Sequence, residues 1–440
     1  MTSTDRPAAA EGPGRTRQAE VFRSGVLGRR PRVPVGAAAL EHRARRAMSR
    51  RAWAYVAGGA GAGLTMAANR AAFAQWSIVP RMLAGASRRD LGVELFGRRL
   101  PTPLLLSPIG AAALAHRDSD VLAATAAASL GVPFVISSQG CSPMEDVAAA
   151  MGASPRWYQL YWSTDEPLVD SMIRRAEAIG CDALVVTVDT TMLGWRPEDL
   201  TLGSLPFAQG IGIAQYTSDP RFQQVVADRL AKPRGPASPV RVTPAAVRSL
   251  LSITREHPGR FGDNLRSAVP RAAVEAFLDI YSNPGLGWDD LATLRHRTRL
   301  PFLVKGVLHP DDARRAVEAG ASGVVVSNHG GRQVDGSIAS LDALPAVREA
   351  VGADTVVVLD SGVRTGADVL KALALGADVV GIGRPWVYGL AVAGREGVGE
   401  VVANLLAELE LTMGLSGVDS VRSVAPELLR REWGPWSRSP

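Results

Sequence analysis

Eight short apolar runs alternate with amphipathic stretches of a dozen or more residues, and this alternation constrains the fold more than any other feature. Within each run the apolar residues are nearly continuous, which is typical of parallel strands that are buried on both faces and connected by helices. Eight such units are the number that closes a parallel barrel, so the sequence predicts an α/β fold, a (β/α)8 TIM barrel. The runs occupy residues 103–110, 133–139, 156–162, 183–189, 301–307, 323–330, 355–362 and 379–384.

Helical patterns lie between these runs and in front of them. Residues 38–73 predict an N-terminal helical segment of short helices hinged on a glycine turn at 56–63. Residues 1–35 are rich in Pro, Gly, Ala and Arg without periodicity, so we expect a disordered arm, followed by the barrel over 36–430 and a tail over 431–440. Between the runs, apolar periodicity predicts helices at 165–179, 310–319 and 366–375.

The connection after the fourth run, residues 190–300, is far longer than the others. Such long segments in compact domains usually act as lids or are disordered. Helical patterns at 243–255 and 270–281 indicate that this one has structure of its own. We interpret it as a lid insertion over the barrel mouth, with a structural insertion or an oligomer contact as the alternative.

Composition excludes several classes of protein. Of 440 residues, 46% are hydrophobic and 21% charged, which suits a large globular core. The net charge of +6 comes from scattered arginines, so no nucleic-acid partner is expected. No apolar run reaches the length of a bilayer span and no signal-peptide order is present, so we expect a cytoplasmic protein without a membrane partner. Two cysteines, Cys141 and Cys181, cannot form a disulfide scaffold or a zinc site, and no metal is expected.

Polar residues and glycines follow the apolar part of every run. In a parallel barrel the carboxyl ends of the strands meet at one rim, where the reacting groups lie. Because burying an unpaired polar group costs about 1–3 kcal/mol, their recurrence at eight ends favours a functional rim. The group comprises Ser107, Pro108, Ile109, Gly110, Ser137, Ser138, Gln139, Gln159, Tyr161, Thr187, Asp189, Lys305, Ser327, Asn328, His329, Asp360, Ser361, Gly383 and Arg384.

Lys305 lies inside the apolar run PFLVKGV of a chain that has only two other lysines. A buried ammonium group needs an anionic partner. That partner is either a carboxylate on a neighbouring strand or a ligand that develops negative charge. A reduced flavin, whose N1 and O2 edge becomes anionic, fits the second description.

His329 follows its strand in SNHGGRQVDG, three residues before Arg332, and the fourth run leads into Asp189 and then Arg196. A base that a carboxylate orients, flanked by two guanidinium groups, is what proton abstraction from a carboxylate-bearing substrate requires. We therefore favour a catalytic role for His329 over a structural one.

The last two runs lead into the motifs DSGVRTGAD and GIGRPW, which place Arg364 and Arg384 beside glycines ahead of a helix. Backbone N–H groups at a helix start, together with arginine, form a phosphate site. The loops after strands seven and eight are the usual phosphate position in such barrels.

Taken together, these motifs resemble the FMN-dependent 2-hydroxy-acid oxidases and dehydrogenases, which include glycolate oxidase, lactate oxidase, mandelate dehydrogenase and lactate 2-monooxygenase. YQLYW, VTVDTTMLGWR, PFLVKGV, SNHGGRQVDG, DSGVRTGADVLKALALGA and GIGRPW stand in family order, and the resemblance covers residues 38–425. YVAGGAG, VPRML, LSPIG, FGRR and GWRPEDLTLGSLPF are most similar to the lactate 2-monooxygenase branch. The resemblance implies FMN as the cofactor and a homo-oligomer, either tetramer or octamer.

The resemblance also implies a role for each matching residue. His329 is the active-site base and Asp189 is its partner. The groups implied to bind the substrate are Tyr55, Tyr161, Arg196 and Arg332, of which Tyr161 hydrogen-bonds the substrate oxygen and the others hold its carboxylate. The flavin ring is implied to contact Pro108, Ile109, Gly110, Ser137, Gln159, Thr187, Lys305 and Ser327. The ribityl chain and phosphate are implied to contact Asp360, Ser361, Gly362, Val363, Arg364, Gly383 and Arg384.

Three residues depart from patterns common in this family. Gln139 stands where glycolate oxidases have an aromatic residue, and Trp195 precedes Arg196 where many members carry a second arginine. Ser361 replaces a usual glycine. The first two positions face the substrate in the family, so they bear on which acid is accepted.

The expected function is FMN-dependent oxidation of a small, lactate-like L-2-hydroxy acid with oxygen as acceptor, giving a 2-oxo acid and peroxide. One alternative is oxidative decarboxylation of the lactate 2-monooxygenase type, to the shortened acid, CO2 and water. Another is a flavin barrel that acts on a larger biosynthetic substrate. A flavin barrel used as an isomerase would not need the pair Arg196 and Arg332, and a non-catalytic one would not need His329 and Asp189.

Overall fold

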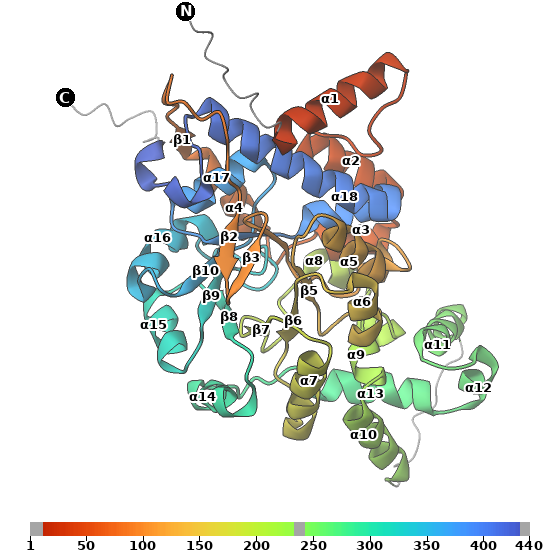
Figure 1. Ribbon diagram of the computed structural model, residues 1–440. Coiled ribbons are helices and arrows are strands. Elements are labelled where there is room, and N and C mark those ends of the chain that lie inside the picture. The colour runs from red at the N-terminus through yellow and green to blue at the C-terminus, as the bar shows by residue number, and fades with distance from the viewer. Residues whose placement is uncertain (1–11, 233–242, 432–440) are drawn as a thin grey trace, which may run out of the picture.

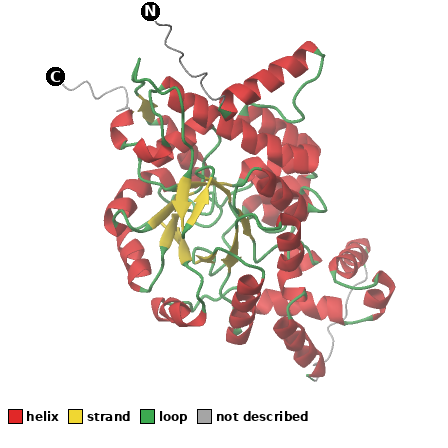
Figure 2. Cartoon of the chain, viewed as in Figure 1, coloured by secondary structure: helices red, strands yellow, loops and turns green. Residues whose placement is uncertain are grey.

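The computed structural model describes residues 12–232 and 243–431, and a barrel of parallel strands lies at its centre (Figures 1 and 2). The barrel strands are β4 (Leu104–Leu106), β5 (Phe134–Ile136), β6 (Arg156–Leu160), β7 (Ala183–Thr187), β8 (Phe302–Val307), β9 (Gly323–Val326), β10 (Val356–Leu359) and β11 (Val379–Ile382). They follow one another around the ring in chain order, and β11 closes it by pairing with β4. The predicted (β/α)8 barrel is therefore confirmed.

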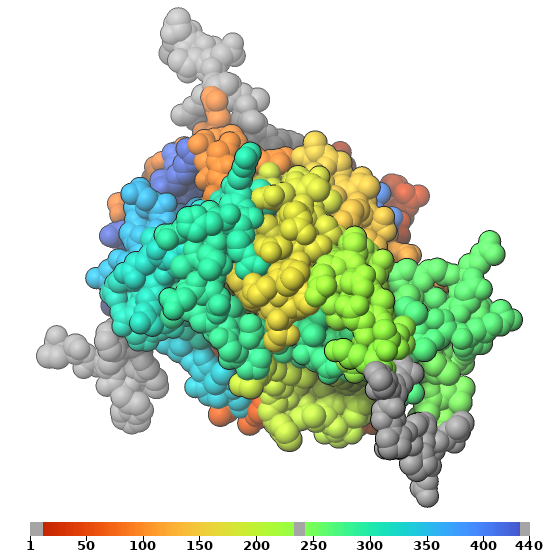
Figure 3. Space-filling view, turned by 90° about the horizontal axis from the view of Figure 1, so that it is seen from below, coloured from red at the N-terminus to blue at the C-terminus, as the bar shows by residue number. Residues whose placement is uncertain are grey.

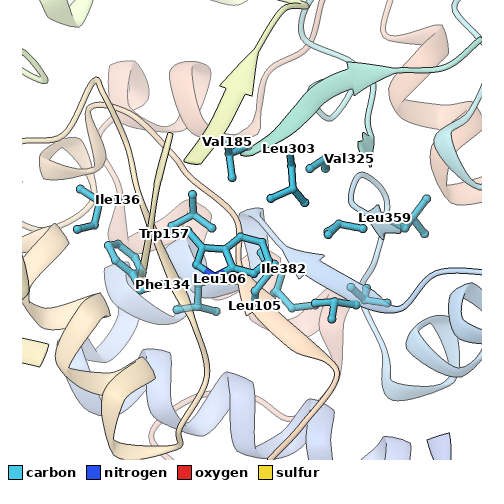
Figure 4. Close-up of a cluster of buried hydrophobic side chains, with 14 of the residues drawn as sticks. Leu105, Leu106, Phe134, Ile136, Trp157, Val185, Leu303, Val325, Leu359 and Ile382 are labelled. Carbon is cyan, nitrogen blue, oxygen red and sulfur yellow. The ribbon is translucent and has the colours of Figure 1, made fainter. Parts of the chain in front are cut away.

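Each of the eight predicted runs contains one barrel strand that is shorter than the run. The strands are buried along almost their whole length because both faces are covered, which explains why the runs are continuous in hydrophobicity. Side chains from all eight strands join one hydrophobic cluster, and Figure 4 shows part of it around Trp157. Most polar residues that end the runs lie past the strands in the rim loops, whereas Gln159, Thr187 and Lys305 lie within β6, β7 and β8.

Helices surround the barrel on its outside (Figure 1). They are α5 (Ser119–Ser129), α6 (Met144–Met151), α7 (Glu166–Ala178), α14 (Trp288–Arg297), α15 (Pro310–Glu318), α16 (Ser340–Val351), α17 (Gly366–Ala374) and α18 (Arg384–Leu415). The helices predicted at 165–179, 310–319 and 366–375 correspond to α7, α15 and α17. Within the described residues no helix is long and apolar enough to cross a membrane.

Four helices precede the barrel: α1 (Pro13–Val26), α2 (Ala37–Ala47), α3 (Arg50–Ala57) and α4 (Leu64–Ala74). The predicted glycine turn lies between α3 and α4. It docks on the loop after β9, where the N–H of Ala60 donates to the carbonyl of Gly331 at 2.8 Å. Asp335 from that loop accepts hydrogen bonds from the N–H groups of Ala62 (2.6 Å) and Thr65 (3.0 Å) at the start of α4.

The expected disordered arm over residues 1–35 is wrong in its described part, because residues 13–26 form α1. This helix packs on α18 (Figure 1), where the N–H of Gly14 donates to the buried carboxylate of Glu410 at 3.1 Å. Arg17 of α1 pairs with Glu400 of α18, with Arg17 Nη2 3.4 Å from Glu400 Oε2. Partners almost 400 residues away stabilise α1, and local composition cannot show them. Residues 1–11 lie outside the described part of the chain.

Short elements complete the fold on the side of the chain termini. Two antiparallel sheets pair β1 (Trp76–Ile78) with β12 (Leu429–Arg431) and β2 (Val93–Leu95) with β3 (Arg98–Leu100). The predicted tail boundary at residue 430 falls inside β12, because Arg431 pairs with Trp76. Residues 432–440 are outside the described residues. The short 3-10 helices include η1 (Ala112–Leu114), η3 (Val421–Ser423) and η4 (Pro426–Leu428).

The insertion after β7 is mostly helical. It contains α8 (Pro197–Thr201), η2 (Pro206–Gln209), α9 (Ala214–Thr217), α10 (Pro220–Ala231), α11 (Pro244–Glu256), α12 (Phe261–Arg266) and α13 (Val269–Ile280). The predicted helical pieces at 243–255 and 270–281 correspond to α11 and α13. In Figure 3, α11 and α12, in green, stand out from the rounded body. Leu193, Phe207 and Tyr281 line the cavity at the barrel rim, so the two ends of the insertion reach the mouth while its middle lies to one side.

Candidate active site

A cavity lies at the rim formed by the carboxyl ends of the barrel strands, with an empty volume of about 970 Å³ that includes space open to solvent. The predicted site residues that line it are Tyr55, Pro108, Ile109, Gly110, Gln159, Tyr161, Arg196, Lys305, His329, Arg332, Asp360, Ser361, Gly362, Val363, Arg364, Gly383 and Arg384. The remaining ones, Ser137, Thr187, Asp189 and Ser327, lie directly behind this lining and contact it. The structure thus brings all of them to one place.

The predicted base, His329, and its predicted partner, Asp189, are in contact. His329 Nδ1 lies 2.8 Å from Asp189 Oδ1, and the Thr190 hydroxyl donates to the same carboxylate oxygen at 2.8 Å. With Nδ1–H donated to Asp189, the imidazole is fixed and its Nε2 is the atom that can accept a proton. Because His329 lines the cavity, this atom is available to a bound substrate.

Protonation states at neutral pH follow from the surroundings of this pair. Burial lowers the pKa of His329; Asp189 opposes this effect, and Lys305 and Arg196 reinforce it. Burial by itself raises the pKa of Asp189, but the charge that His329 carries when protonated, the charge of Lys305 and the hydrogen bonds from His329 and Thr190 outweigh it and hold that pKa well below its usual range. Asp189 is therefore ionised and His329 is neutral, as a general base requires.

A glycine in β8 makes room for Asp189. Gly306 has a φ of +107° and lies where the register between β8 and β9 shifts from Lys305 to Val307. A Cβ atom at this position would lie 2.6 Å from the Asp189 Cβ. Bulges beside active sites re-aim side chains. Here the bulge lets the carboxylate reach both the imidazole and the ammonium group.

Lys305 has the carboxylate partners considered for it from the sequence and also lines the cavity, where a ligand as a further partner stays a prediction. It is 4% exposed; its Nζ donates to Ser327 Oγ at 2.9 Å and lies 3.6 Å from Asp189 Oδ2 and 3.8 Å from Asp360 Oδ2. Burial lowers the pKa of Lys305, but the two carboxylates outweigh it and raise that pKa, so the ammonium stays charged. A fixed positive charge at the cavity wall stabilises an anion formed in the cavity.

A row of polar side chains continues from Lys305 across neighbouring strands. Gln159 Nε2 donates to Thr187 Oγ1 at 2.9 Å, and Ser137 Oγ donates to Gln159 Oε1 at 3.0 Å. Thr187 is the register partner of Lys305. These residues lie on β5 to β8 or directly after them. Such a row of donors and acceptors is what the polar edge of a flavin ring needs.

The HGG turn after β9 has three consecutive residues in the left-handed region: His329 (+57°), Gly330 (+66°) and Gly331 (+75°). A Cβ atom at Gly331 would lie 2.7 Å from the N atom of Met66. The turn therefore requires a glycine there. It aims the imidazole at the cavity while the backbone packs against the start of α4.

Two guanidinium groups face the cavity beside Tyr55 of α3. Arg332 lies over the Tyr55 ring, 4.9 Å from its centroid, and Nη1 donates to the carbonyls of Tyr55 and Gly58. Arg196 Nε donates to the carbonyl of Arg332 at 3.2 Å. Burial and the like charge of Arg196 lower the pKa of Arg332 to about 9. An anion placed between two such groups relieves their repulsion, so this wall suits a substrate carboxylate.

The other end of the cavity fits a phosphate. Arg364 and Arg384 line it, and α18 begins there at Arg384, directly after Gly383, so the start of a helix lies at this end of the cavity. A Cβ atom at Gly383 would meet nothing closer than 4.0 Å, so the space beside this backbone is open. Arg384 also donates to the carbonyls of Val56, Gly58 and Gly330, which fixes its guanidinium. Donors, charge and space therefore match those that FMN requires.

Sequence reasoning missed Gln333, which connects the carboxylate wall to the base. Its Oε1 accepts from Arg196 Nη2 at 2.9 Å, and its Nε2 donates to the carbonyls of Asp189 (2.7 Å) and Met192 (2.9 Å). The side chain thus holds the loops after β7 and β9 together. Its position directly after Arg332 is the one sequence signal that points to it. Thr190, which donates to Asp189, was missed in the same way.

Replacing Gln333 with leucine is expected to raise KM for the expected 2-hydroxy acid about tenfold, because Arg196 and the loop of Asp189 both lose a hydrogen-bond partner. The KM measured with purified holoenzyme checks this, with FMN content as the measure of folding. Gln224→Leu on the exposed face of α10 serves as the matched control and should leave KM unchanged. An unchanged KM in Gln333→Leu would contradict the anchoring role.

The barrel, the rim cavity and the arrangement of an oriented base, paired arginines and a buried ammonium define the class of flavin-dependent barrel oxidoreductases. The model of the family "FMN-dependent dehydrogenase" matches residues 44–431, and the chain belongs to this family. FMN is its cofactor.

Named relatives match along almost the whole chain. The chain is 42% identical to FMN-dependent alpha-hydroxy acid dehydrogenase qulF of Penicillium citrinum, covering 94% of this chain and 95% of the relative. It is 40% identical to L-lactate oxidase of Lysinibacillus sphaericus, covering 84% of this chain and 86% of the relative. The crystal structure of mandelate oxidase is similar with a TM-score of 0.72 at 32% identity, covering 90% of this chain and 98% of that one.

Proposed function

We propose that this enzyme oxidises a small, lactate-like L-2-hydroxy acid with FMN and uses oxygen as the acceptor, giving a 2-oxo acid and hydrogen peroxide. The observation that carries the proposal is that the His329–Asp189 pair and the guanidinium groups of Arg196 and Arg332 face one cavity. The names of the relatives, L-lactate oxidase and alpha-hydroxy acid dehydrogenase, support this substrate class.

The residues divide the work on such a substrate. Arg196, Arg332 and the Tyr55 hydroxyl hold the carboxylate, which fixes C2 in the cavity. Burial raises the pKa of Tyr161, so its hydroxyl stays protonated and donates to the substrate oxygen. His329 Nε2 takes up the proton that the substrate releases, and Asp189 stabilises the resulting imidazolium. FMN, when bound, supplies the two-electron acceptor for this oxidation, and Lys305 provides positive charge at its polar edge.

Oxidative decarboxylation to the shortened acid, CO2 and water is a second candidate. It requires that the 2-oxo acid stays in the site while oxygen reacts. Leu193, Phe207 and Tyr281 of the insertion line the cavity, and the Tyr55 and Phe207 rings lie edge to face at 6.2 Å. This enclosure on the side of the insertion favours retention of the product.

Anaerobic reduction of the holoenzyme by a panel of L-2-hydroxy acids tests the proposal. We expect the flavin absorbance to bleach, and hydrogen peroxide to form when air is admitted. Carbon dioxide in place of peroxide would establish the second candidate. A flavin that no 2-hydroxy acid bleaches would overturn both. We also propose a homo-oligomer, tetramer or octamer, which light scattering of the purified protein checks; a cytoplasmic location stays a prediction.

The pH dependence should report His329. Because the base acts in its neutral form and its pKa is lowered, kcat/KM is expected to stay high as the pH falls through about 6.5 and to decline only below it. Asp189 is the group that raises the pKa of His329, so Asp189→Asn should move this acidic limb to still lower pH, with a lower maximal rate. A limb that moved to higher pH in Asp189→Asn would contradict the assignment.

A further inference from the structure

Gln139 follows β5 and reaches the cavity with an unpaired side chain. The residue is 7% exposed and lines the cavity. Its backbone is satisfied, because its N–H donates to Ser137 Oγ at 3.1 Å and its carbonyl accepts from the N–H of Ala111 at 2.9 Å. Its side-chain amide makes no hydrogen bond with any residue in 12–232 or 243–431. One carbonyl and one amino group therefore face the cavity without a protein partner.

Other glutamines near the site are fully engaged. Gln159 uses both ends of its amide, on Ser137 and Thr187. Gln215 accepts from the N–H of Met144 at 2.9 Å and donates to the carbonyl of Ser142 at 2.9 Å. Gln333 makes bonds at both ends as well. Buried polar groups are normally paired. The Gln139 amide differs from these three, because it faces the open cavity, where a bound molecule can pair with it.

The fold leaves space for this amide. Gly110 lacks the Cβ atom that would lie 2.7 Å from the Gln139 Cβ and 3.0 Å from its Oε1. The segment after η2 also packs closely, because a Cβ at Gly212 would lie 2.9 Å from the Gln139 carbonyl oxygen. The side chain is thus held between the loop after β4 and the insertion, and it faces the cavity lined by the ring of Phe207.

Different residues of the cavity recognise different parts of the substrate. The substrate carboxylate meets the guanidinium groups, and the reacting oxygen meets His329 and Tyr161. A neutral amide adds little to either contact, because both places already hold stronger donors and acceptors. What remains of a 2-hydroxy acid is its side chain. An amide that donates and accepts recognises a neutral polar group there.

Building on the proposed function, we propose that Gln139 is a specificity-determining residue that hydrogen-bonds a hydroxyl or amide on the side chain of the 2-hydroxy acid. The preferred substrates are then small acids whose side chain ends in such a group. An acid that presents only a methyl group leaves the amide unpaired, which is the origin of the preference.

Matched pairs of acids that differ by one hydroxyl test this proposal. The pairs are L-lactate with L-glycerate, and L-2-hydroxybutyrate with L-2,4-dihydroxybutyrate. In the holoenzyme we expect the hydroxylated member of at least one pair to have a kcat/KM about 10- to 100-fold higher. In Gln139→Leu, which keeps the approximate shape but loses both polar atoms, the ratio should fall to near 1. The exposed control Gln224→Leu should keep the original ratio.

A binding experiment separates this proposal from the proposed function. Pyruvate and hydroxypyruvate differ by the same hydroxyl, and their Kd values follow from changes in the flavin spectrum without turnover. If no 2-hydroxy acid reduces the flavin, the proposed function fails. The Kd ratio of the two oxo acids, compared between the original chain and Gln139→Leu, still shows whether Gln139 recognises the hydroxyl.

Two further results would overturn the role of Gln139. One is a substrate ratio and a Kd ratio that are the same in the original chain and in Gln139→Leu. The other is a loss of FMN affinity in Gln139→Leu with unchanged ratios, which would assign the amide to the cofactor. If Gln139→Leu does not fold, Gln139→Met serves as a second apolar variant, and FMN content measures its folding.

Discussion

Replacing His329 with glutamine is expected to slow anaerobic reduction of the bound FMN by a 2-hydroxy acid about 10³- to 10⁴-fold. Glutamine retains polar atoms near Asp189 but cannot take up a proton at neutral pH. FMN should remain bound, because its predicted contacts lie on other residues. Stopped-flow measurement of the flavin absorbance gives the rate, and the yellow colour of the purified variant shows that the cofactor is present.

Two controls make this result specific. His42→Gln on the exposed face of α2 changes the same residue type away from the cavity and should leave the rate unchanged. Asp189→Asn should retain FMN and lower the rate, because the imidazolium loses its counter-charge. Rapid bleaching of the flavin in His329→Gln would remove His329 from the mechanism.

Replacing Lys305 with methionine is expected to lower the free energy of unfolding by about 3–5 kcal/mol, because two buried carboxylates lose their ammonium partner. The same change should slow flavin reduction about 10²- to 10³-fold, since a preorganised positive charge at the cavity wall is lost. Denaturant unfolding of the FMN-free protein measures the first effect, and stopped-flow reduction of the holoenzyme measures the second.

Lys232→Met provides the control for this experiment. Lys232 is exposed at the end of α10, so its replacement should change the free energy of unfolding by less than about 0.5 kcal/mol. Lys305→Arg, which keeps the charge, should recover part of the stability. Equal stability of Lys305→Met and the original chain would show that the carboxylates do not depend on the ammonium group.

The barrel could be predicted because its signal is local. A strand such as β7 is buried at every residue and apolar up to its last one, Thr187, since both of its faces are covered. A helix such as α17 carries its own cap, in which Thr365 and Asp368 bond each other's backbone N–H groups. Such features depend on a few neighbouring residues. Many of the rim residues were predictable for the same reason, because they lie at the ends of these strands or directly follow them.

Other features depend on partners far away in the chain. Helix α1 is polar and was expected to be disordered, but Glu410 and Glu400 of α18 bind it. Gln333 and Gln139 are two glutamines in rim loops, and nothing in their immediate sequence shows that one has partners at both ends of its amide while the other has none. That difference arises only when the loops after β4, β5 and β9 meet the insertion after β7.

By itself, the sequence determined the parallel barrel and the set of side chains that reach its rim, because hydrophobic pattern and motif spacing fix both, and its motifs indicated FMN as the cofactor. The tertiary structure decided how those side chains are charged and paired. Asp189 stays ionised and Lys305 stays cationic although both are buried, because they lie 3.6 Å apart where electrostatic interactions are strong. Burial and the charge of Lys305 keep His329 neutral.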